Sequence, residues 1–281
     1  LLLAFCITSK TNAQDAGNFT GGFQSSANIF IRDSLIGAAN IPQYDNQLFG
    51  GQAWLDLGYN VQGFDLGLRF DMFNNSNLFN PNDSYTDEGI GRWHIGKKIN
   101  KLDLRVGHIY DQIGSGIIYR AYEERPLLID NALYGARLIY DLGENWQIKG
   151  FSGRQRFLFS QYEPILSGGS LEGYIDLSSE EKNFTLAPGV GLVNRTLDEE
   201  TMGRVIDIVK NYQDVDQFIP EYNTYAASIF NTLTAGRISW YAEAAFKSSE
   251  AFFDPNAIKT EASGAKTFGK MVKESGSVLY S

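Results

Sequence analysis

AWLDLGYNVQGFDLGLRFDM, residues 53–72, is the stretch that decides the fold of this 281-residue chain. Apolar and polar or small residues alternate over residues 53–61, and after a short corner they alternate again over residues 64–72. A period of two over about ten residues predicts a β-strand with one apolar and one polar face. A strand of that length, tilted by about 45°, spans the hydrocarbon core of a bilayer. The stretch therefore predicts a hairpin of a transmembrane β-barrel.

The composition agrees with such a barrel. The chain is 43% hydrophobic with a mean hydropathy of -0.24, and it has no apolar run of the roughly 18 residues that a transmembrane helix needs. A slightly hydrophilic chain still fits a membrane barrel, because every second residue faces the water-filled interior. The net charge of -9, without a basic stripe, argues against nucleic acid as a partner.

The N-terminus predicts export. Residues 1–7 are mostly apolar and lead into the polar residues 8–14, which together indicate the remnant of a secretory signal peptide. Lipid attachment at Cys6 is the less favoured alternative, because Phe5 is too large for the position before a lipidated cysteine. We therefore expect a signal remnant at residues 1–14, a barrel over residues 15–281, and location in a bacterial outer membrane.

Further strands follow along the whole chain, and short corners alternate with long connections, as in bacterial outer-membrane barrels. The strands are expected near residues 19–31, 48–60, 64–73, 89–99, 102–110, 132–141, 146–152, 171–177, 184–195, 224–232 and 238–247. Pro188 suggests a bulge or a strand end, and Asp198–Tyr212 has helical spacing after possible caps. Because the chain stops inside an apparent new strand at 278–281, we expect an all-β, antiparallel, up-and-down transmembrane barrel, here a truncated fragment of about 11–12 strands that is incomplete at its C-terminus.

The connection Asp111–Asn131 is the best candidate for a pore constriction. Glycines at 114 and 116 let it turn inward, and its aromatic and charged side chains could contact a passing solute. A surface loop with local ion pairs is the alternative. The constriction candidates are Tyr119, Arg120, Tyr122, Glu123, Glu124 and Arg125.

Charges of both signs lie on the polar faces of the expected strands. They include the pore-lining candidates Arg69, Arg92, Arg105 and Arg137. Such charges either filter solutes through the field that they create in a pore, or pair across neighbouring strands and hold a wet interior together. Both interpretations stay open.

Enzymatic and metal chemistry find little support in the sequence. Two distant histidines do not make a metal site, and His108 lacks the nearby serine that an outer-membrane phospholipase would need. The polar loop Asn74–Glu88 lacks the spaced acidic pattern of a calcium loop. We therefore expect no catalytic residue, no metal and no cofactor.

Three segments resemble an uncharacterised family of porin-like outer-membrane β-barrels from Bacteroidota-type bacteria. They are GNFTGGFQ at 17–24, GRWHIG at 91–96, and the segment from Gly107 through Tyr134. The resemblance implies location and fold, and it brings no biochemical activity.

Two functions are then expected. The first is porin-like passage of small hydrophilic solutes across the lipid bilayer. The alternative is a plugged barrel that acts as a scaffold or a surface-binding component of an outer-membrane complex, with other outer-membrane proteins as partners.

Overall fold

The computed structural model describes residues 17–31, 33, 35, 47–78, 83–179 and 183–281. The chain divides into two compact units, residues 1–99 and residues 100–281, and each unit is built on antiparallel β-strands. The expected signal remnant at residues 1–14 lies outside the described residues.

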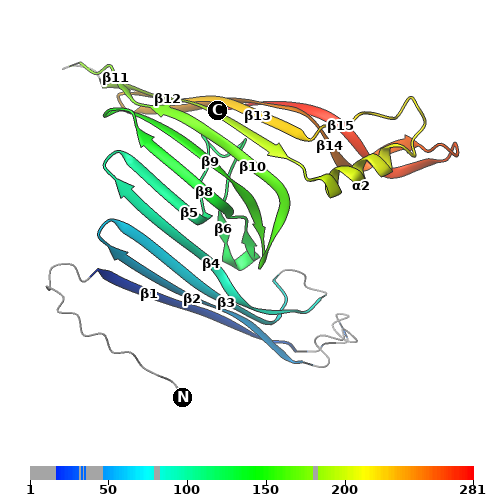
Figure 1. Cartoon of the computed structure of the whole chain (residues 1–281), viewed down its shortest axis with the longest axis horizontal. Helices are drawn as coiled ribbons and strands as arrows, with labels where there is room; N and C mark the ends of the chain where they lie inside the picture. The colour runs from blue at the N-terminus through cyan, green and yellow to red at the C-terminus, as the bar shows by residue number, and fades with distance from the viewer. Residues whose placement is uncertain (1–16, 32, 34, 36–46, 79–82, 180–182) are drawn as a thin grey trace. The chain divides into compact units, whose positions relative to one another are not determined.

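The first unit holds four strands, which are neighbours in the order of the sequence (Figure 1). They are β1 (Asn18–Ile29), β2 (Phe49–Val61), β3 (Phe64–Ser76) and β4 (Tyr85–Ile99). Leu57 stands opposite Leu68 and Val61 opposite Phe64, so β2 and β3 form the hairpin expected from residues 53–72.

The second unit is also an up-and-down sheet, in the order β5-β8-β9-β10-β12-β13-β14-β15. Its strands are β5 (Leu102–Ile109), β8 (Leu133–Asp141), β9 (Trp146–Phe157), β10 (Ser160–Gly173), β12 (Phe184–Thr196), β13 (Asn223–Ala235), β14 (Ile238–Thr260) and β15 (Lys266–Tyr280). The short β11 (Ile175–Asp176) pairs with β12, and β6 (Glu123–Glu124) pairs with β7 (Ile129–Asp130). The predicted all-β, antiparallel, up-and-down fold class is confirmed.

Two connections that we expected to be long loops are strands instead. Residues 153–170 continue β9 and begin β10, and residues 248–276 form the outer part of the β14–β15 hairpin. The strand expected at 171–177 is correspondingly the end of β10 followed by β11. In these parts the backbone N–H and C=O groups of each strand form hydrogen bonds with the partner strand of the hairpin. The strands therefore continue beyond the residues in which apolar and polar side chains alternate.

Pro188 lies inside β12, and its pairing with β13 has no register shift there. On the opposite side of β12, pairing with β10 ends at Gly189 and pairing with β11 begins at Leu186. Pro188 therefore faces the break between β10 and β11, where a missing N–H removes no ladder hydrogen bond. The irregularity expected at Pro188 is present as a break between the neighbouring strands β10 and β11, and β12 itself continues through Pro188.

The expected helix is confirmed as α2 (Glu199–Val209). Its buried side chains Met202, Val205 and Val209 recur at helical spacing, and the last two pack in a small core with Met271 of β15. No helix among the described residues has the length and apolar character needed to cross a membrane.

Asp198 begins α2, and its carboxylate accepts a hydrogen bond of 2.8 Å from the backbone N–H of Thr201. Hydrogen bonds from Thr201 lower the pKa of Asp198, so the cap is charged at neutral pH and weakens to a neutral cap when the pH falls through the lowered pKa. We expect Asp198→Ala to speed amide hydrogen exchange at Thr201 about fivefold, whereas Asp198→Asn, which keeps a capping oxygen, should change it little. Equal exchange in both variants would contradict this role.

Candidate functional site

The two faces of each sheet differ in an unusual way. In β3, Arg69 and Asp71 are 1% and 3% exposed, whereas their neighbours Phe70 and Met72 are 42% and 49% exposed. In β9, Lys149 is 9% and Ile148 is 44% exposed. We call the face with Arg69 or Lys149 the polar face of its sheet, and the opposite one the apolar face. A water-soluble sheet shows the reverse arrangement.

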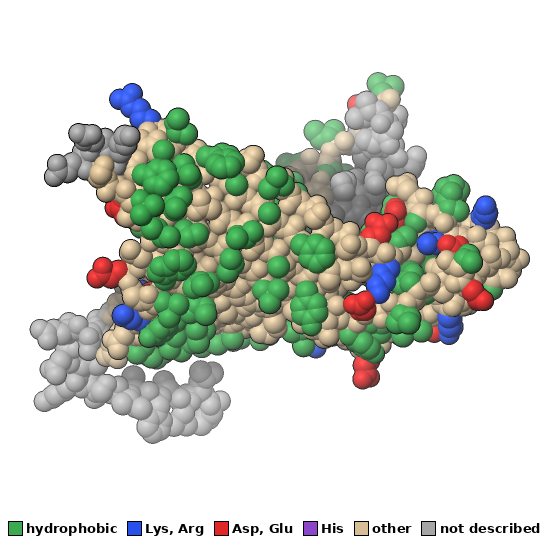
Figure 2. Space-filling model, turned by 90° about the horizontal axis from the view of Figure 1, so that it is seen from above, with side chains coloured by type: hydrophobic (Ala, Val, Ile, Leu, Met, Phe, Trp, Pro, Cys, Tyr) green, Lys and Arg blue, Asp and Glu red, His purple; other side chains and the backbone are tan. Residues whose placement is uncertain are grey.

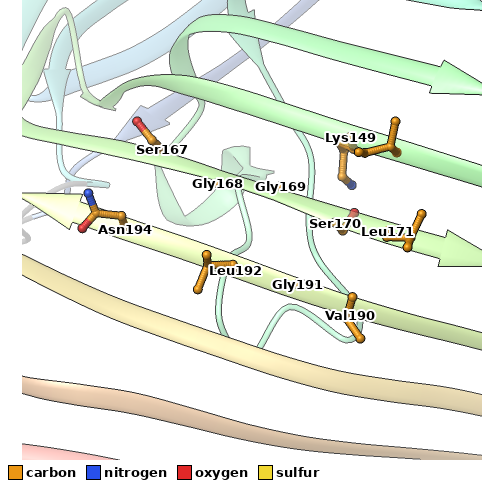
Figure 3. Close-up of a pocket in the computed structure, with 11 residues that line it drawn as sticks. Lys149, Ser167, Gly168, Gly169, Ser170, Leu171, Val190, Gly191, Leu192 and Asn194 are labelled. Carbon is orange, nitrogen blue, oxygen red and sulfur yellow. The ribbon is translucent and has the colours of Figure 1, made fainter.

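The apolar face is extensive. Figure 2 shows hydrophobic side chains spread over the surface in view. One hollow has a volume of about 510 Å³. It is lined by Leu171, Val190 and Leu192 beside Gly168 and Gly169 (Figure 3). Apart from Lys149, no charged side chain lines this hollow, which therefore suits hydrocarbon better than a polar solute.

The connection between β5 and β8, residues 110–132, lies against the polar face of the second unit. We call it the β5–β8 loop. Two of its residues, Ile113 and Tyr119, join a buried cluster with Phe151 of β9, Val193 of β12 and Phe230 of β13. The Tyr119 and Phe151 rings stack with their centroids 4.3 Å apart. The loop therefore spans several strands and shares their core.

Ion pairs fix the start of the β5–β8 loop. The Asp111 carboxylate lies 2.7 Å from Nζ of Lys149 and 3.1 Å from an Nη of Arg137. All three side chains are at most 13% exposed. Charges with so little access to water are held in place by their partners, because separating them would leave Asp111 without a cation, and Arg137 and Lys149 with only the longer contacts to Asp103 and Glu172.

A second anchor joins the loop to β14. The backbone N–H and the hydroxyl of Ser115 donate to the Glu243 carboxylate at 2.9 Å and 2.5 Å, and the Tyr241 hydroxyl donates to it at 2.6 Å. Glu243 is 1% exposed. Gly114 has φ +55, and a Cβ there would lie 2.9 Å from Glu243 Oε1. The glycine therefore lets the backbone come close enough for Ser115 to reach the carboxylate.

The returning part of the loop is anchored as well. Asp130 accepts a hydrogen bond of 2.8 Å from the Tyr110 hydroxyl and pairs with Arg156 of β9. The Asn131 side chain accepts a hydrogen bond of 2.6 Å from the backbone N–H of Tyr122. The loop is thus held at its start, its middle and its end.

The structure distributes the six constriction candidates along this loop. Tyr119 is buried, and burial together with the nearby Asp111 charge raises the pKa of its phenol far above the usual range. Arg120 is exposed and lies over the Tyr122 ring, 4.5 Å from its centroid. Glu123 pairs with Arg125 at 2.9 Å, and Glu124 is exposed. Arg120 and Glu124 are therefore exposed at this surface, Tyr122, Glu123 and Arg125 are partly buried, and Tyr119 is buried in the cluster that the loop shares with the strands.

The four arginines of the strands are mostly engaged in ion pairs. Arg69 donates to both carboxylate oxygens of Asp71 at 2.6 Å and 2.9 Å. Arg92 pairs with Asp56 at 2.9 Å. Arg137 pairs with Asp111, and Arg105 lies half-buried on the polar face of β5. Arg69 thus pairs within β3, Arg92 with a residue of β2 and Arg137 with the β5–β8 loop, and a role of these arginines in filtering solutes stays a prediction.

Sequence reasoning missed the residues that seat the loop. The sequence predicted no anchoring role for Asp111, Ser115, Lys149, Phe151 or Glu243. A charged residue at the first position after a strand is the one signal that pointed to Asp111. Nothing in the local sequence pairs Ser115 with Glu243.

Comparisons with known proteins add a family and one distant structure. A family model described as "Family of unknown function (DUF6029)" matches residues 1–279. A search of curated proteins gave no match. The crystal structure of Pseudomonas aeruginosa OccK9 (OpdG) is similar at 12% sequence identity and a TM-score of 0.34, over 91% of this chain and 75% of that chain. The predicted resemblance to an uncharacterised family is thereby confirmed, and its bacterial group stays a prediction.

Proposed function

We propose that this chain, which belongs to the DUF6029 family of unknown function, is an outer-membrane β-barrel that lets small hydrophilic solutes pass in the manner of a porin. The observation that carries the proposal is the reversed burial of the two sheet faces. Leucine, isoleucine and phenylalanine side chains are exposed on the apolar face while arginine, lysine and glutamate are buried on the polar face. Such a sheet is stable where lipid covers its apolar face and water or polar groups cover its polar face.

In this proposal the β5–β8 loop narrows the channel. It covers part of the polar face of β9, β12, β13 and β14, and it presents Arg120 and Glu124 at its exposed surface. Porin-like channels select solutes where such a loop brings charged side chains close to the path. The proposal gives the protein no enzymatic activity and no cofactor.

The direct test is reconstitution in planar lipid bilayers. Purified protein in a salt solution should raise the conductance in discrete steps of uniform size. A folded, inserted protein that gives no steps at any voltage would overturn the channel.

A second candidate function is a plugged barrel that binds partners at the cell surface. It is favoured by the outer part of the β14–β15 hairpin, where α2 packs and where Phe253, Ile258 and Phe268 are 60%, 51% and 72% exposed. Such exposed apolar side chains are typical of interaction sites. Stable capture of an outer-membrane protein, together with silent bilayers, would decide for this function.

The charges of the loop allow a test of its position. We expect Arg120→Ala combined with Arg125→Ala to shift selectivity toward cations, because two positive charges leave while Glu123 and Glu124 remain. Reversal potentials in a salt gradient measure the shift. Lys101→Ala, which removes a positive charge at the short β4–β5 corner, is the control. An unchanged reversal potential in the double variant would contradict the position of the loop along the path of the ions.

A further inference from the structure

A polar hollow of about 350 Å³ lies in the first unit, in a different part of the chain from the β5–β8 loop. Residues of all four strands line it, and its charged side chains come from β2, β3 and β4. They are Asp56, Asp65, Arg92 and His94. The hollow is thus a cluster of titratable groups that the constriction does not use.

The register of the strands explains how Thr20 and His94 come to line this hollow. Thr20, Gly58, Gly67 and His94 stand opposite one another in a row across β1, β2, β3 and β4. A Cβ at Gly58 would lie 2.5 Å from Oγ1 of Thr20, and a Cβ at Gly67 would lie 2.2 Å from Cε1 of His94. The Thr20 hydroxyl therefore lies over Gly58 and the His94 ring over Gly67, and only glycine at these two positions leaves room for them beside the hollow.

An ion pair and a hydrogen-bonded pair form the walls. Asp56 and Arg92 are joined at 2.9 Å, with side chains 29% and 27% exposed. Asp65 and His94 are joined at 3.1 Å, with side chains 40% and 18% exposed. Asn60, opposite Asp65 in the register, adds an amide to the lining. The hollow therefore offers both hydrogen-bond donors and acceptors at groups that a small molecule can still reach.

The balance of charge favours one class of ligand. Each carboxylate already has a partner, so a free anion or cation would have to compete with the Asp56–Arg92 ion pair or with the Asp65–His94 hydrogen bond. A hydroxyl group both donates and accepts, and neighbouring hydroxyls can bond to a carboxylate and to a guanidinium without separating them. A concave site with a few converging polar groups is also the usual form of a small-molecule site.

We propose that this hollow is a binding subsite for a neutral polyhydroxylated solute, such as a simple sugar, along the path of the channel. The inference rests on the proposed function, because it treats the polar face of the first unit as part of that path. It adds to that function the class of solute that the channel favours.

Maltose is the probe for the test. Isothermal titration of the detergent-solubilised full chain should show saturable binding, and maltose should reduce the single-channel current in a concentration-dependent way. We expect Asp56→Asn combined with Asp65→Asn to weaken both effects at least about tenfold, because two charge-assisted hydrogen bonds become neutral ones. Asp103→Asn is the matched control, because Asp103 is a partly exposed carboxylate outside the hollow, 3.7 Å from Arg137.

The outcomes separate this inference from the channel itself. Conductance steps that maltose leaves unchanged in the wild-type protein, with no heat of binding, would overturn the subsite and leave the channel standing. Saturable binding without conductance steps would support the hollow as a binding site and overturn the channel. Equal weakening of maltose binding by Asp103→Asn would also overturn the subsite. If the double variant does not fold, the titration of the wild-type protein with maltose still tests whether the protein binds the sugar.

Discussion

Leu138→Arg should lower the free energy of unfolding by about 2–4 kcal/mol in a lipid bilayer, which is the cost measured for arginine near the bilayer midplane on the lipid face of a barrel. Leu138 lies on the apolar face of β8, between Leu104 of β5 and Gly150 of β9, and it is 41% exposed. In water an arginine at so exposed a position would cost little. The size of the loss therefore measures whether this face meets lipid.

The control for this substitution lies on the other face. Thr232 of β13 is half-buried opposite Tyr241 of β14, on the face that carries Glu243. Thr232→Arg should cost clearly less than Leu138→Arg when both are unfolded by urea from phospholipid vesicles, because the new guanidinium reaches water and carboxylates. Equal losses of unfolding free energy in Leu138→Arg and Thr232→Arg would contradict the interpretation that lipid covers the apolar face of the sheet.

Asp111→Ala should release the start of the β5–β8 loop. The substitution leaves Lys149 and Arg137 without their shared carboxylate at sites that are 9% and 12% exposed. Breaking a buried ion pair from one side costs about 3–5 kcal/mol, and we expect a loss of this order in the stability of the seated loop. The unitary conductance should rise, because the loop then spends much of its time away from the polar face.

Asp103→Ala is the control for this second prediction. Asp103 also faces Arg137, but at 3.7 Å and with 38% of its side chain exposed, so its removal should be worth less than about 1 kcal/mol. Amide hydrogen exchange across residues 111–121 reports loop release independently of conductance. Unchanged exchange and conductance in Asp111→Ala would show that the apolar contacts alone hold the loop.

The sequence predicts the fold well wherever alternation is strong. Residues 53–72 predict the β2–β3 hairpin, and the helical spacing of Met202, Val205 and Val209 predicts α2. Local pattern fails in the outer hairpins at 153–170 and 248–276, where β-strands continue with mixed side chains. There the strand conformation depends on pairing with a partner strand, which the pattern of one strand does not report.

The candidate site shows the same limit at a larger distance. Glycines and aromatic residues at 114–122 predict a loop able to fold inward, and the structure confirms that it packs on the polar face. The partners that hold it come from β8, β9 and β14. Which distant strand brings a carboxylate to Ser115 depends on sheet order and register, so it could not be read from residues 111–131.

The bond between Ser115 and Glu243 also sets an order of events during folding. The two residues are 128 positions apart in the chain, whereas neighbouring strands are joined by far shorter connections. Contacts between distant residues form late, because the entropy of closing the intervening chain is lost before they contribute. We therefore expect Glu243 to reach the loop only after β14 has joined β13, so that the loop takes its final position in a late step of folding.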